Sequence, residues 1–70
     1  MELKRLNGEI IEVVDWETVV HYMVDDVREE INREIAPCSE QEFFSEYEKK
    51  HLEMYGEESF DVFCEFISYR

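Results

Sequence analysis

Two histidines and two cysteines are the residues of this chain best suited to metal binding or nucleophilic chemistry. They are His21, Cys38, His51 and Cys64. Zinc prefers imidazole and thiolate ligands, but compact zinc sites place two of them within a few residues, and here each stands alone. A thiolate could attack a substrate with a histidine as base, yet no glycine loop resembles an oxyanion hole. We therefore expect a protein that is not an enzyme and has no metal, no cofactor and reduced thiols.

Carboxylates are the dominant chemical feature of the chain. Nineteen Asp and Glu residues stand against seven Lys and Arg, which gives a net charge of −12. That exceeds the magnitude of about 2 to 8 that solubility requires. Because self-repulsion at this density opposes compaction, we expect a benefit from it, such as attraction to a basic partner. Asp25 and Asp26 lack the alternating oxygen ligands and turn glycine of a calcium loop.

Helical spacing arranges many of these carboxylates in rows. Asp26, Glu30 and Glu34 are four residues apart, which places them about 6 Å apart along a helix axis. A row with this spacing can imitate the phosphates of one DNA strand, which repeat every ~3.4 Å along the duplex axis and lie farther apart through space. The alternative is a solvated face that only keeps the protein soluble. The residues predicted to bind a partner are Asp25, Asp26, Glu29, Glu30, Glu34, Glu42 and Glu46.

The first row must lie on a helix predicted from Trp16 to near Ile35. Apolar residues recur there at intervals of three and four, which is typical of one buried helical face. Asp15 is suited to cap the start of this helix, and Pro37 must end it because proline lacks an amide proton. The apolar positions are Trp16, Val19, Val20, Met23, Val27 and Ile31.

A second helix is predicted from Glu40 to about Tyr55. Ser39 and Glu42 match a capping box at its start, and Gly56 is suited to close it. The two helices should form a helical hairpin whose inner faces meet. Four glutamates of the second helix are expected on its outward face: Glu42, Glu46, Glu48 and Glu53.

The segments on either side of these helices indicate β-structure. Asn7-Gly8 is a strong turn signal between strands predicted at 2–6 and 9–14, with Lys4 and Arg5 expected to pair across the turn with Glu9 and Glu12. Residues 59–69 fit both a strand and a helix. We favour a strand because an isolated hairpin is unstable in water without a third one. The helical alternative rests on Phe60, Phe63, Cys64 and Ile67.

The predicted fold is therefore α+β, a three-stranded antiparallel sheet covered by a two-helix hairpin in the order ββααβ. Its alternative is a β-hairpin with three helices. Residues 1–70 should form a single domain, since a chain of this length holds only one core. The sequence shows no signal peptide and no membrane-length apolar stretch, so we expect a cytoplasmic protein. A homodimer would add buried area.

Two segments carry a resemblance to known proteins. Residues 22–30 and 36–43 resemble a stretch shared by small uncharacterised acidic proteins of phages and mobile elements of Gram-positive bacteria. In size and acidity the chain is also similar to anti-CRISPR and antirestriction proteins that imitate DNA. This likeness of type implies a phage inhibitor acting in the cytoplasm of a bacterial host.

The predicted function is a non-catalytic inhibitor that binds a basic nucleic-acid-binding host protein, such as a CRISPR effector nuclease, as a DNA mimic. The alternative is a small dimeric regulatory module. It would bind through apolar residues such as Tyr22, Tyr55 or Tyr69. The salt dependence of binding distinguishes the two functions, because salt screens contacts between surface charges but does not weaken the burial of apolar area.

Overall fold

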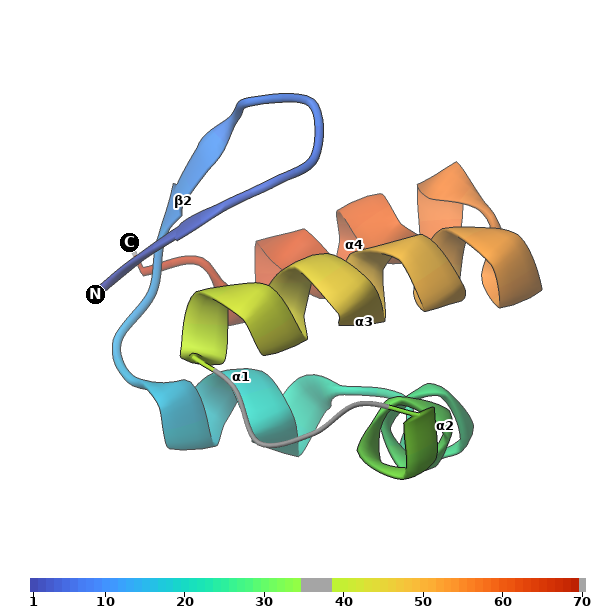
Figure 1. The fold of residues 1–70 in the computed structure, drawn as a ribbon. Coiled ribbons are helices and arrows are strands. Elements are labelled where there is room, and N and C mark those ends of the chain that lie inside the picture. The colour runs from blue at the N-terminus through green and yellow to red at the C-terminus, as the bar shows by residue number, and fades with distance from the viewer. Residues whose placement is uncertain (35–38, 70) are drawn as a thin grey trace.

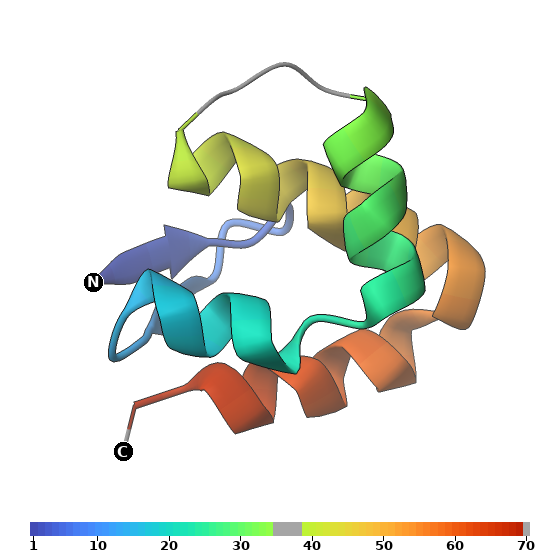
Figure 2. The same ribbon diagram turned by 90° about the horizontal axis from the view of Figure 1, so that it is seen from below.

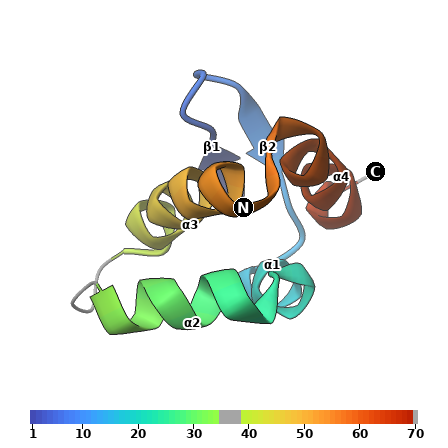
Figure 3. The same ribbon diagram turned by 90° about the vertical axis from the view of Figure 1, so that its right-hand side faces the viewer.

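The computed structural model describes residues 1–34 and 39–69, which form a short β-hairpin followed by four helices (Figure 1). Helices α3 and α4 lie side by side in a middle layer, with the hairpin on one side and α1 and α2 on the other (Figures 1 and 3). The elements are β1 (Glu2–Lys4), β2 (Ile10–Glu12), α1 (Trp16–Tyr22), α2 (Asp25–Glu34), α3 (Glu40–Tyr55) and α4 (Glu57–Ile67).

The predicted fold class is wrong. The described residues form a two-stranded sheet and four helices, which excludes both the ββααβ arrangement and the alternative with three helices. Residues 59–67 belong to α4 and not to a third strand. These residues are helical because a stripe of apolar side chains at helical spacing packs against α1 and α3. The stripe consists of Phe60, Phe63, Cys64 and Ile67, all buried.

The helix predicted from Trp16 to near Ile35 is two helices, which accounts for the extra element. Met23 is extended, with φ −64° and ψ 141°, and ends α1. The Val24 amide donates to the Tyr47 hydroxyl at 2.9 Å instead of to a carbonyl of the preceding turn. Asp25 and Asp26 then begin α2, where the helix dipole favours negative charge. The predicted stop at 35–37 lies outside the described residues.

Three helix ends predicted from local residue types, at Asp15, Ser39 and Gly56, are confirmed. The Asp15 carboxylate accepts a hydrogen bond from the Thr18 amide at 2.8 Å. The Ser39 hydroxyl accepts one from the Glu42 amide at 3.1 Å. Gly56 closes α3 with φ +90°, a conformation that side-chain-bearing residues rarely adopt.

The hairpin forms where Asn7-Gly8 predicts it, but its strands are shorter than expected. Side chains of α3 take the place of the missing third strand. The Lys4 amide donates to Gln41 Oε1 at 2.8 Å, and Gln41 Nε2 donates back to the Lys4 carbonyl at 2.9 Å. On the other side, Val13 forms an antiparallel bridge with Ser68, which directly follows α4, and α4 runs beside α1 (Figure 2).

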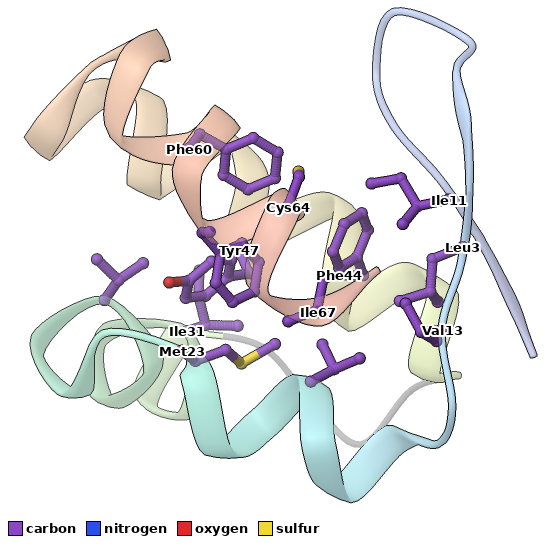
Figure 4. Close-up of a cluster of buried hydrophobic side chains, with 13 residues drawn as sticks. Leu3, Ile11, Val13, Met23, Ile31, Phe44, Tyr47, Phe60, Cys64 and Ile67 are labelled. Carbon is purple, nitrogen blue, oxygen red and sulfur yellow. The ribbon is translucent and has the colours of Figure 1, made fainter. Parts of the chain in front are cut away.

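The core lies where the middle layer of α3 and α4 meets the hairpin on one side and α1 and α2 on the other. Phe44, Tyr47 and Phe60 are completely buried, and the ring of Phe60 contacts those of Phe44 and Tyr47 (Figure 4). Leu3 and Ile11 close the core from the hairpin, and Val19 and Val27 close it from α1 and α2. In the described part of the chain, every helix is too short or too polar to cross a membrane.

Candidate partner-binding surface

The seven carboxylates predicted to bind a partner lie on two helices that pack against each other. Five are on α2, and Glu42 and Glu46 are on α3 (Figure 3). The side chain of Asp25 is 77% exposed and that of Glu30 is 39% exposed. A rigid helical scaffold therefore presents all seven to solvent at least in part. We call these seven residues the acidic surface.

Basic residues neutralise part of the acidic surface. Four of its seven carboxylates form ion pairs, whereas Asp26, Glu29 and Glu42 form none with the described residues. Exposed pairs of this kind contribute about 0–1 kcal/mol, so the arginines and lysines of a partner could replace them at little cost. The pairs are Arg28–Asp25 at 3.0 Å, Arg33–Glu30 at 3.3 Å, Lys50–Glu34 at 3.5 Å and Lys49–Glu46 at 3.2 Å.

One glutamate predicted to face outward is buried. Glu48 is 2% exposed, and its Oε1 accepts a hydrogen bond from the Leu6 amide at 2.9 Å. Its Oε2 lies 3.7 Å from Nε of Arg5, which also contacts Glu9 and Asp61. The Arg5 guanidinium stands 5.0 Å from the centre of the Phe60 ring. Of the pairs predicted across the turn, Arg5 forms one with Glu9. The sequence does not indicate the pair with Glu48, because only the fold brings the hairpin to α3.

His51 belongs to a buried hydrogen-bond chain. Burial raises the pKa of Tyr47 to about 12, so its hydroxyl keeps its proton. That hydroxyl accepts from the Val24 amide and therefore donates its single proton to His51 Nδ1, 2.9 Å away. The imidazole must then be neutral, with Nε2–H donating to the Ser59 hydroxyl at 2.9 Å. These hydrogen bonds connect α3 to α4 and to the break between α1 and α2.

The hydrogen bonds of His51 predict that the free energy of unfolding depends on pH. Burial lowers the pKa of His51 from its ordinary value of 6.5, so the unfolded chain takes up the proton first as the pH falls. The contribution of His51 is complete at neutral pH and should decrease below about pH 6.5. In urea unfolding, wild type should therefore lose part of its stability advantage over His51→Gln between about pH 7.5 and 5.5. The control is His21→Gln, which changes an exposed histidine and should lose stability relative to His51→Gln over this pH range just as wild type does. A stability difference between wild type and His51→Gln that stays constant over this range would contradict the assignment.

The other candidate residues for chemistry are dispersed. Burial raises the pKa of the Cys64 thiol to about 12, which makes it a poor nucleophile. His21 is exposed and contacts only the Tyr22 ring among the aromatic side chains described. Cys38 lies outside the described residues. Within residues 1–34 and 39–69, no three His, Cys, Asp or Glu side chains are grouped so that they could hold a metal ion.

The aromatic residues of the alternative prediction also reach the surface. Tyr22, Tyr55 and Tyr69 are 45%, 46% and 64% exposed. Tyr22 is not isolated, because its ring stacks on Phe66 of α4, with centroids 5.6 Å apart and an interplanar angle of 16°. Sequence reasoning missed this pair because it placed Phe66 on a strand.

The described residues thus make up a small acidic helical protein in which carboxylates dominate the exposed charge and His51, Glu48 and Cys64 are buried. The family model of the anti-CRISPR protein AcrIC5 matches residues 6–60, from the hairpin turn into α4. This is most of the chain, which therefore belongs to the AcrIC5 anti-CRISPR family. Among curated proteins and solved structures, no significant match is found.

The family assignment supports the sequence-based prediction of an anti-CRISPR inhibitor, and it implies a Cas protein as the partner. It assigns no role to individual residues. The acidic surface therefore remains a prediction, and α2 and α3, which carry it, lie entirely within the matched residues.

Proposed function

We propose that this protein inhibits CRISPR interference by occupying the basic nucleic-acid channel of a Cas effector nuclease as a non-catalytic mimic of DNA. The observation that carries the proposal is the acidic surface, in which two packed helices hold seven carboxylates at or near the solvent. Channels that bind phosphates gain most of their affinity from arrays of Lys and Arg, so a rigid carboxylate array can compete for them.

The charge distribution supports the same proposal. Five of the six basic residues that the structure describes already form ion pairs with carboxylates, so few free cations oppose a basic partner. The excess of carboxylates should also steer the protein toward a positively charged groove and speed association.

The salt dependence of binding tests this proposal. The Kd for the Cas nuclease should rise at least about tenfold between about 50 and about 200 mM salt, because ions screen contacts between exposed charges. Calorimetry or biolayer interferometry with the purified nuclease would measure it. An affinity that does not change over this range would contradict DNA mimicry and favour binding through apolar surface.

A further inference from the structure

The stacked pair of Tyr22 and Phe66 is an unusual feature of the surface, because two large rings contact each other while much of each faces solvent. Tyr22 ends α1 and is 45% exposed, and Phe66 lies in the last turn of α4 and is 62% exposed. Val62, one turn before Phe66 on the same helix, is 51% exposed. We call Tyr22, Val62 and Phe66 the aromatic patch.

The aromatic patch contributes little to the core. Helix α4 buries its other side, with Phe60 and Phe63 against α3 and with Ile67 fully enclosed. Both rings stand on helices that contact each other, and each ring stacks on the other without any partner. Rigid aromatic side chains of this kind are the residues that most often dominate binding energy in protein interfaces.

Carboxylates at helical spacing neighbour Val62 on α4 and select the kind of partner. Glu58 and Glu65 lie one helical turn on either side of Val62, and both are exposed. Asp25 begins α2 three residues after Tyr22 and is also exposed, although its carboxylate is already paired with Arg28 at 3.0 Å. A second copy of the chain would bring the same carboxylates and a further net charge of −12, so charge repulsion opposes a homodimer on this face.

A ring beside a carboxylate is complementary to arginine. The guanidinium stacks on an aromatic face through its planar charge and pairs with a carboxylate through its N–H groups. Its aliphatic stem can cover the apolar atoms of Val62 and Phe66. The protein shows the same combination internally, where Arg5 stands over Phe60 and pairs with Asp61 at 3.2 Å.

We infer that the aromatic patch is a second contact with the Cas protein, and that it receives arginine side chains from the partner's basic surface. This inference rests on the proposed function, since it takes the same partner. Val62 and Phe66 lie beyond the residues matched by the family model, which ends at Phe60.

The test compares two double variants for binding to the purified Cas nuclease of a system that the chain inhibits. Tyr22→Ala/Phe66→Ala should raise the Kd about tenfold or more. The control, Ile10→Ala/Met54→Ala, removes side chains that are 59% and 45% exposed elsewhere and should stay within about twofold of wild type. Circular dichroism checks that both variants are folded.

Phe66→Leu keeps an apolar side chain on the exposed face of α4 and removes only the ring, so it tests the inference even if the double variant unfolds. It should weaken binding about threefold because stacking of a cation on a ring is lost. A double variant or a leucine variant that binds as wild type would overturn the inference. So would a wild type that is dimeric and becomes monomeric in Tyr22→Ala/Phe66→Ala, since the second copy would then be the occupant.

The two proposals fail in different ways. Loss of affinity in the patch variants, combined with full binding to nuclease that is already loaded with DNA, would reject DNA mimicry and keep the arginine contact. Salt-dependent binding that the patch variants leave unchanged would do the reverse.

Discussion

The variant Arg5→Met should be largely unfolded at room temperature. Its side chain is 9% exposed and that of its partner Glu48 is 3% exposed, so removing the arginine leaves a buried carboxylate without its cation. Breaking a buried pair in this way costs about 3–5 kcal/mol. A core of this size supplies a net stability of only about 3–5 kcal/mol, so the loss should be nearly complete. Circular dichroism with urea unfolding measures it.

Three further variants show that the buried charge is the cause. Glu48→Gln should cost less, because Arg5 keeps Asp61 and Glu9 as partners. The double variant Arg5→Met/Glu48→Met should regain part of the loss, since no charge is then buried. Arg33→Met, which breaks an exposed pair with Glu30, should change stability by less than about 1 kcal/mol. An Arg5→Met protein with the urea midpoint of wild type would refute this account of the hairpin.

Neutralising one row of the acidic surface should weaken inhibition strongly. The variant Asp26→Asn/Glu30→Gln/Glu34→Gln removes three carboxylates from α2 and also frees Arg33 and Lys50, which pair with two of them. Both effects weaken the electrostatic attraction between this face and a basic partner. With about 0.2–1 kcal/mol for each exposed contact, we expect a total of about 2 kcal/mol, or a Kd about 30-fold higher. Titration with the Cas nuclease and a cleavage assay measure the change.

The matched control removes the same charge elsewhere. Glu2, Glu12 and Glu57 are exposed on the hairpin and at the start of α4. Changed together to Gln, they should leave the Kd within about threefold of wild type, since only long-range attraction is lost. Equal effects of the two triple variants would show that net charge alone, and not the acidic surface, determines binding.

Local chemistry allowed the helix ends to be predicted from sequence. Asp15, Ser39 and Gly56 act within three or four residues of their own positions, and all three have their predicted roles. The errors concern contacts that are distant in sequence. The predicted first helix breaks because the Val24 amide donates to the hydroxyl of Tyr47, which is distant in sequence. The sequence pattern of residues 59–69 fits both a strand and a helix, and only packing of one face against α1 and α3 decides for the helix.

The candidate site shows the same division between local and distant effects. Helical periodicity placed Asp26, Glu30 and Glu34 on an exposed row, and they are at least partly exposed on α2. The pair between Glu34 and Lys50 depends on how α2 packs on α3. Burial of Glu48 depends on where the hairpin docks, so its assignment to the outward face from the apolar pattern of the helix was wrong.

Competition with DNA is the most direct test of the mimic. The Cas nuclease is incubated with its DNA target first, and the inhibitor is then added, with the reverse order as the comparison. DNA mimicry predicts that nuclease already loaded with DNA does not bind the inhibitor, and that excess DNA displaces the inhibitor from free nuclease. A stable ternary complex of nuclease, DNA and inhibitor, with affinity equal to that for the free nuclease, would contradict it.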